Sequence, residues 1–268
     1  MRLVLLLAMT VVVALVSPVS AAVKPRLLLN VGYEAGTLDS GIPNLQATVA
    51  SAPDAAVVST AYARSGQYSI DHKVVLDDPA YVSAGAPRSE SATNRVTSSF
   101  YSSGLRRRYE FSFLLANWQP WDGEATPVDI IWQFHRFGAS ADMFVAVKRN
   151  SLVLRYNGTG QSTLINDIRP YVNQWIDMRI DVLWASTPDG WANVQVRLPG
   201  QPDYASVFGS YFATLDPTFT SSPDGYLTWG LYRPDSSSAA GDPITRIIYH
   251  DDIRVFELPH SSSLPGAG

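Results

Sequence analysis

Hydrophobic and polar residues alternate along most of the chain in short runs. Successive side chains of a strand point to opposite faces, so each run predicts a strand with one buried side. The clearest runs cover residues 109–113, 142–154, 175–182, 191–198, 226–232 and 247–256, and turn-forming pairs such as Asn157-Gly158 and Pro199-Gly200 separate them. No segment keeps the spacing of an amphipathic helix beyond one or two turns. The pattern predicts an all-β fold, a single-domain β-jelly-roll sandwich.

The N-terminal segment differs from the rest. Arg2 precedes a mainly apolar run from Leu3 to Val16, and small residues follow it. This order predicts a secretory signal peptide over residues 1–21, cleaved before Ala22. A membrane anchor is the alternative, but a spanning helix needs about 20 apolar residues. We expect a secreted, extracellular protein with a folded domain over residues 22–259, a flexible tail over 260–268 and no membrane contact after cleavage.

Composition and charge exclude several classes of protein. Of the 268 residues, 46% are hydrophobic, which excludes a disordered chain. The net charge of −4 and the lack of a long basic run argue against nucleic acid as a partner. The chain has no cysteine, which excludes disulfides, thiol nucleophiles and cysteine-based metal sites. With 7 Trp and 13 Tyr, it suits a β-rich domain with an aromatic-lined surface.

Three predicted strands carry polar groups on a single face. Residues two apart on a strand share a face, so Arg88 lies beside Glu90, and Gln133 beside His135. In the segment 226–232, the even-numbered positions (Tyr226, Thr228, Gly230 and Tyr232) share the other face from Leu227, Trp229 and Leu231. Each group has an ordinary structural role on its own, as an ion pair, a polar pair or packing. Their joint occurrence predicts a functional groove.

These segments resemble the signature strands of jelly-roll polysaccharide lyases. Arg88-Ser89-Glu90, Gln133-Phe134-His135 and Tyr226-Leu227-Thr228-Trp229-Gly230-Leu231-Tyr232 occur in the order found in alginate lyases. The resemblance spans roughly residues 30–257 and extends to glucuronan lyases and heparin lyase I. It implies a concanavalin-like jelly roll and an enzyme that cleaves a uronic-acid polysaccharide by β-elimination. The partner it implies is an acidic polysaccharide, and we expect a monomer.

The resemblance also implies roles for four catalytic residues. β-Elimination removes the C5 proton of a uronate, so charge develops on the adjacent carboxylate and must be stabilised by aimed donors. Arg88 and Gln133 would supply these donors. Tyr232 would be the acid that protonates the leaving oxygen. His135 would be the base for one uronate epimer.

Further residues would form the substrate groove. Tyr226 would orient the sugar, and Glu90 would hold Arg88. Thr228 stands where alginate lyases have lysine, Arg95 lies near Ala92, where they usually have a second arginine, and Arg233 follows Tyr232 in place of asparagine. These departures put alginate in doubt more than they do the chemistry.

The chemistry requires no cofactor, although lyases of this group often hold a structural calcium ion. The candidate ligands are Glu34 with Asp251 or Asp252, and the alternative is that these are surface carboxylates.

Two other functions fit the same fold. A non-catalytic, lectin-like carbohydrate-binding module would share the strands and the aromatic residues. A glycoside hydrolase would need two carboxylates facing each other across the groove. Asp177 and Asp181 share a face of their strand, but no strand carries the spacing expected of such an enzyme.

Overall fold

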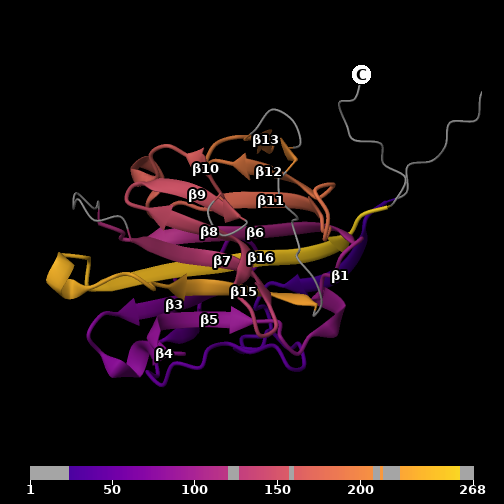
Figure 1. Cartoon of the computed structure of the whole chain (residues 1–268). Coiled ribbons are helices and arrows are strands. Elements are labelled where there is room, and N and C mark those ends of the chain that lie inside the picture. The colour runs from indigo at the N-terminus through magenta and orange to yellow at the C-terminus, as the bar shows by residue number, and fades with distance from the viewer. Residues whose placement is uncertain (1–23, 120–126, 157–159, 208–211, 214–223, 260–268) are drawn as a thin grey trace, which may run out of the picture.

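Two antiparallel sheets pack face to face in the computed structural model, which describes residues 24–119, 127–156, 160–207, 212–213 and 224–259 (Figure 1). The first sheet has nine strands and the second has seven. Strands far apart in sequence lie side by side, such as β5 beside β15. This arrangement confirms the predicted all-β jelly-roll sandwich. The predicted signal peptide, residues 1–21, and the predicted tail, residues 260–268, lie outside the described residues.

The strands follow in the order of each sheet. The nine-stranded sheet runs β13 (Ala205–Ser206), β12 (Trp191–Arg197), β11 (Ile176–Leu183), β6 (Arg106–Ala116), β16 (Thr245–Glu257), β3 (Ser69–Val75) and β2 (Ala56–Ser59), with β1 (Arg26–Val31) on β16 and β14 (Phe212–Ala213) on β12. The seven-stranded sheet runs β10 (Gly160–Ile165), β9 (Ser151–Tyr156), β8 (Ala141–Lys148), β7 (Val128–Arg136), β15 (Gly225–Tyr232), β5 (Ala86–Ala92) and β4 (Val82–Ser83).

The helices of the described part are short 3-10 turns: η1 (Pro79–Tyr81), η2 (Thr97–Ser99), η3 (Arg169–Tyr171) and η4 (Ser238–Ala240). Across the described ranges, no helix has the length and apolar character needed to span a bilayer.

One predicted strand is two. The alternating run over 142–154 is a hairpin in which β8 and β9 are separated by Arg149 and Asn150. Arg149 adopts a positive φ of 54°, a left-handed conformation that reverses the chain without a glycine or proline to announce it. Because both strands of the hairpin alternate, the run reads as continuous in the sequence.

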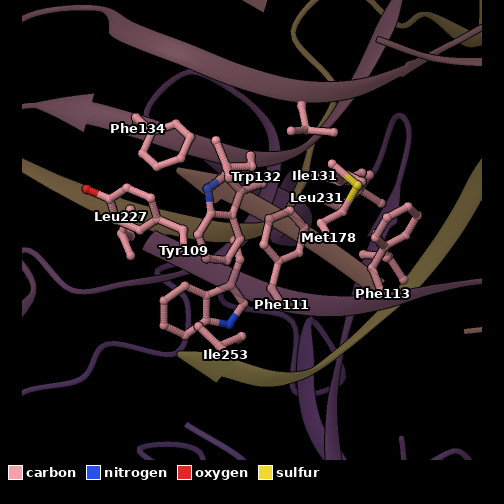
Figure 2. Close-up of a cluster of buried hydrophobic side chains, with 14 of the residues drawn as sticks. Tyr109, Phe111, Phe113, Ile131, Trp132, Phe134, Met178, Leu227, Leu231 and Ile253 are labelled. Carbon is pink, nitrogen blue, oxygen red and sulfur yellow. The ribbon is translucent and has the colours of Figure 1, made fainter. Parts of the chain in front are cut away.

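The core lies between the inner faces of the sheets and is rich in aromatic rings. Figure 2 shows Trp132 and Phe134 of β7 together with Tyr109 and Phe111 of β6. The rings of Phe111 and Trp132 stack with centroids 4.0 Å apart and an interplanar angle of 4°. Leu227, on the inner face of β15, is fully buried. Packing of this density fixes the inner faces of β7 and β15, so their outer faces form a rigid platform.

Bulges set the faces of these two strands. The pairing of β7 with β8 shifts between Ile130 and Trp132, and both Ile131 and Trp132 are fully buried. The extra residue returns Gln133 to the outer face. The pairing of β15 with β7 shifts between Trp229 and Tyr232. Bulges of this kind commonly re-aim a side chain beside a functional site.

Candidate active site

A groove crosses the outer face of the seven-stranded sheet, the face turned away from the core. Its main hollow has a volume of about 770 Å³. The hollow is lined by Arg88, Val128, Ile130, Gln133, His135, Gly138, Ala139, Ser140, Ala141, Phe144, Arg155, Tyr232, Pro234 and Asp235. All four residues predicted to be catalytic are among them. They come from β5, β7 and β15, which neighbour one another in the sheet (Figure 1).

A second hollow of about 280 Å³ lies on the other side of Arg88. Its lining includes Glu90, Asn94, Tyr226 and Thr228, together with Arg88 itself. Because Arg88 lines both hollows, it stands between two parts of one groove. A chain of sugars lying along the groove would therefore pass over the Arg88 guanidinium.

Arg88 is held against Tyr232. The two residues are direct cross-strand partners on β5 and β15, and the guanidinium carbon lies 3.7 Å from the centroid of the Tyr232 ring. The Arg88 Nε atom lies 3.4 Å from Glu90 Oε2, so Arg88 and Glu90 form an ion pair on the same face of β5. No hydrogen bond between described residues uses the terminal nitrogens of Arg88. Those nitrogens are therefore available to an anionic group in the groove.

Glu90 connects the three strands of the site. Gln133 donates from Nε2 to Glu90 Oε1 over 2.6 Å, and the Thr228 hydroxyl donates to the same oxygen over 3.3 Å. Burial raises the pKa of Glu90, and the charge of Arg88 and these hydrogen bonds oppose that rise. Glu90 of β5 is thus a buried carboxylate that binds one residue of β15 and one residue of β7, the next strand beyond it.

The Gln133 amide has one strong and one weak attachment. Its Nε2 donates to Glu90 over 2.6 Å and to Thr228 over 3.2 Å. Since Thr228 can turn its own hydroxyl toward Glu90, the second amide hydrogen can leave Thr228 at little cost. Gln133 can then donate into the groove while Glu90 keeps the side chain oriented.

The His135 ring has a defined proton. Its Nδ1 lies 2.9 Å from the carbonyl oxygen of Arg136, and a carbonyl only accepts, so Nδ1 carries the hydrogen. Nε2 is therefore the basic nitrogen. Burial, together with the positive charges of Arg88 and Arg136, lowers the pKa of His135 despite this hydrogen bond. The ring is consequently neutral at neutral pH. Its centroid lies 5.2 Å from the centroid of the Tyr226 ring.

Two residues predicted to bind substrate do not line the groove. Arg233 is only 1% exposed, and its Nε donates to Asp129 over 2.8 Å. The prediction for Arg233 is wrong because Arg233 directly follows the outward-facing Tyr232 at the end of β15, so alternation places its side chain on the inner side, where it is buried. Arg95 is exposed in the segment after β5 but lines neither hollow. By contrast, Glu90, Tyr226 and Thr228 do line the second hollow.

The candidate calcium ligands are already engaged with hydrogen-bond donors. Glu34 accepts the backbone N–H groups of Gln67 and Tyr68. Asp251 accepts the N–H of Arg64, and Asp252 accepts from the Arg254 guanidinium. In the described ranges, no group of three or more acidic or histidine side chains is arranged to hold a metal ion. Calcium binds about six to eight oxygen ligands. The carboxylates of Glu34, Asp251 and Asp252, already engaged with N–H donors, do not fit such a site.

The two aspartates weighed for a glycoside hydrolase lie on the other sheet. Asp177 accepts hydrogen bonds from Arg64 and Arg197, and Asp181 binds Arg108. Both carboxylates therefore belong to ion pairs of the nine-stranded sheet and do not face the groove.

Several groove residues were missed by the sequence reasoning. Val128 and Ile130 of β7 and Phe144 of β8 form an apolar floor, and Arg155 of β9 stands at its edge. Their outward positions follow only from the bulge in β7 and from the turn between β8 and β9. Dividing the run 142–154 into two strands would have placed Phe144 and Arg155 on neighbouring strands.

Comparisons with known proteins bear on family and fold. A family model described as Polysaccharide lyase matches residues 32–254. The structure is similar to an endo-β-1,4-glucuronan lyase from the fungus Trichoderma reesei, with a TM-score of 0.57 and 17% identity over 85% of this chain and 96% of that one. It is also similar to the marine PL-14 alginate lyase from Aplysia kurodai, with a TM-score of 0.52 and 10% identity over 89% and 100% of the two chains.

The fold is not confined to lyases. The receptor binding domain of botulinum neurotoxin type G aligns with a TM-score of 0.50 and 14% identity over 87% of this chain and 49% of that one. No curated protein matches the chain by sequence. At such identities the structural likeness shows the fold alone, whereas the family match spans most of the chain.

Proposed function

Because the chain belongs to the polysaccharide lyase family, we propose that it cleaves a uronic-acid polysaccharide of the glucuronan or alginate type by β-elimination. One observation carries the proposal: Arg88, Gln133, His135 and Tyr232 line the same hollow. These residues offer a charged donor, a neutral donor, a base and an acid. In this proposal the enzyme is secreted and works on an extracellular acidic polymer.

The first task is to stabilise charge on the substrate carboxylate. The C5 proton of a uronate is weakly acidic because its removal pushes electrons onto a group that is already negative. The free terminal nitrogens of Arg88 form a charged fork suited to a carboxylate. Gln133 adds a neutral donor beside it. Donors held in place before the reaction stabilise the developing charge without reorganisation.

The second task is to move two protons. For the epimer whose C5 proton faces His135, Nε2 takes that proton, and the C–H electron pair becomes the C4–C5 double bond. The bond between C4 and the glycosidic oxygen then breaks, and the Tyr232 hydroxyl protonates the departing oxygen. For the opposite epimer, Tyr232 would act as base as well as acid. Tyr226, 5.2 Å from His135, would orient the sugar.

Glucuronan is the substrate that should be tested first. The fungal glucuronan lyase aligns over nearly its full length with this chain. Thr228 replaces the lysine of alginate lyases, so the groove lacks one cation that an alginate enzyme would have.

A lectin-like carbohydrate-binding module is the second candidate. The fold does not separate it from a lyase, because a neurotoxin receptor binding domain shares the sandwich. Such a module would use the groove for binding and would have no need of an oriented acid and base.

Ultraviolet absorbance of the unsaturated uronate product tests the proposal. Glucuronan, polymannuronate, polyguluronate and heparin would be offered separately to the wild type and to Tyr232→Phe. We expect a rise on one polymer, reduced about 10²–10⁴-fold in the variant. Tyr204→Phe is a matched control, because Tyr204 also stacks on an arginine, Arg179 at 4.1 Å. No absorbance change on any polymer, with binding retained, would favour the lectin-like module.

A further inference from the structure

Among the described residues, two cations at one end of the groove have no acidic partner: Arg155, which lines the main hollow, and Lys148, which lies beside it without lining the hollow. Arg155 of β9 donates from Nε to Gln161 Oε1 over 3.2 Å, and Lys148 of β8 reaches the same oxygen over 3.4 Å. Gln161 of β10 is the direct cross-strand partner of Arg155. Two positive side chains therefore share one neutral acceptor.

This arrangement differs from the other cations of the same sheet. Arg88 pairs with Glu90, and Arg136 pairs with Asp142 over 2.8 Å. Between residues that the structure describes, no ion pair involves Arg155 or Lys148. No described residue therefore cancels their charge, which adds positive potential to this end of the groove within the described part of the chain.

The position of Arg155 relative to the catalytic residues follows from strand register. Arg155 pairs with Phe144, Phe144 pairs with Gln133, and Gln133 pairs with Thr228. Neighbouring strands lie about 4.8 Å apart, so Arg155 is about 10 Å along the sheet from Gln133. This separation is comparable to the length of a disaccharide unit.

The floor between the two ends is apolar. Val128, Ile130 and Phe144 line the hollow, and Ala146 and Val153 are buried beneath them in the same small cluster, against which Tyr232 packs. The Arg155 guanidinium carbon lies 5.9 Å from the centroid of the Phe144 ring. Pyranose rings have an apolar face of axial C–H groups, which an aromatic and aliphatic floor can contact. A carboxylate on such a ring would then face the cations at the edge.

We propose that Arg155 and Lys148 form a second carboxylate subsite, which binds a uronate residue beyond the one that undergoes elimination. The inference rests on the proposed function, and it assigns to the groove a direction across β7, β8 and β9. A substrate long enough to reach β9 gains a second anchored carboxylate. A shorter substrate does not, so the enzyme prefers longer chains.

The test compares Arg155→Gln with wild type on long and short substrates. On the polymer cleaved by the wild type, we expect KM to rise about tenfold with kcat nearly unchanged. A rise of this size corresponds to the loss of one charge-assisted contact. On the shortest oligosaccharide that is still cleaved, we expect no change. Lys148→Gln should act in the same direction, and raised salt should weaken wild-type binding more than binding of either variant. An equal effect on long and short substrates, or none, would overturn the proposal.

Two controls check that the change in KM comes from this subsite. Lys24→Gln removes one positive charge near Pro25 and Phe256, away from the groove, and should leave KM unchanged. Thermal unfolding of Arg155→Gln should match the wild type, since Arg155 is only partly buried.

Binding of oligouronates to Tyr232→Phe, measured with and without Arg155→Gln, reports the subsite without catalysis. If no polymer is cleaved but Arg155→Gln still weakens this binding, the lyase proposal fails and the subsite stands. If cleavage occurs and the binding is unaffected, the subsite fails and the lyase proposal stands.

Discussion

At the scale of single residues, the site depends on one buried carboxylate. Glu90 contacts Arg88, Gln133 and Thr228, so a single side chain fixes residues of β5, β7 and β15. Its negative charge offsets the charge of Arg88 before substrate binds. In the proposed mechanism, a substrate carboxylate would compete for the same guanidinium from the groove side. In the proposed mechanism Glu90 is therefore a positioning residue, which acts through Arg88 and Gln133.

Replacing Glu90 with Gln should separate the effect of the Glu90 charge on Arg88 from the effect of the size of the side chain. The amide keeps the shape of the side chain but cannot form an ion pair with Arg88. We expect kcat on the preferred polymer to fall about tenfold to a hundredfold, less than the roughly 10²–10³-fold cost of removing an aimed donor, because Arg88 and Gln133 are misaligned rather than lost. Glu110→Gln is the matched control, because Glu110 pairs with Arg179 on the other sheet. Full kcat in Glu90→Gln would contradict the role assigned to Glu90.

The lowered pKa of His135 predicts the acid side of the pH profile. Burial and the charges of Arg88 and Arg136 disfavour the protonated ring, so His135 stays a competent base below the ordinary histidine value of about 6.5. For a substrate that uses His135, the acid limb of kcat/KM should lie below that pH. Burial also raises the pKa of Glu90, so protonation of Glu90 would produce an acid limb as well. The His135→Asn variant shows which of the two groups is responsible. A limb above about pH 6.5 that disappears in His135→Asn would contradict the lowered pKa.

Residue pairs on a common face were predictable from the sequence, whereas strand ends and turns were not. Arg88 with Glu90 and Gln133 with His135 share faces because alternation is a property of any strand. The inward position of Arg233 follows from the same alternation, since it directly follows Tyr232, whereas that of Arg155 depends on an unmarked turn after β8. The roles of Gln133 and Tyr232 were implied by resemblance and remain predictions.

At the scale of elements, the bulge in β15 aims Tyr232. Gly230 adopts a φ of 142°, and a Cβ there would collide with the carbonyl oxygen of Ser89 on β5. The ring of His72 from the opposite sheet closes the inner side of the same position. Glycine is thus required both by its backbone conformation and by the close approach of β5.

Gly230→Ala should lower both stability and activity. The collision is with backbone, which cannot move aside as a flexible side chain would, so we expect unfolding to become easier by about 2–4 kcal/mol. Any relaxation would shift Tyr232 and lower kcat as well. Thermal unfolding and initial rates measure the two effects.

Gly104→Ala provides the comparison for Gly230→Ala. Gly104 also has a positive φ, 88°, but a Cβ there meets nothing within 4 Å. It should cost only about 1 kcal/mol, the conformational part of the effect, and leave kcat unchanged. Equal destabilisation by the two variants would show that crowding at Gly230 is unimportant.

At the scale of the whole molecule, the two sheets have different electrostatic roles. The nine-stranded sheet carries ion pairs such as Arg108–Asp181, which cancel charge locally. The groove end of the seven-stranded sheet keeps Arg155 and Lys148 without acidic partners among the described residues. A chain of net charge −4 can therefore present a locally positive groove to an anionic polymer.

The interior holds two histidines that should make stability depend on pH. Burial lowers the pKa of His72 to about 3 and lowers that of His250 well below its usual value. Each binds its proton only after unfolding, so each favours the unfolded chain as the pH falls from about 6.5 toward the folded pKa. The pKa values of Asp71, Asp142 and Asp251, raised by burial to about 6, act in the opposite direction.

His250→Phe isolates the histidine contribution from the aspartates. Between about pH 8 and pH 5, the wild type should lose about 2 kcal/mol of unfolding free energy that the variant keeps. Urea unfolding of both proteins at the two pH values gives this difference, and the phenyl ring can pack beside Phe111. A gap between the two proteins that does not change with pH would show that His250 is not held neutral.

The masses of the products formed from glucuronan, or from whichever polymer gives the absorbance rise, test β-elimination itself. Because β-elimination adds no water, we expect fragments whose masses sum to that of the parent chain. One fragment of each pair should carry an unsaturated end, and Tyr232→Phe should form neither. Fragments that have gained one water per cleavage would identify a hydrolase and contradict the proposed reaction, and binding without any fragments would identify a carbohydrate-binding module.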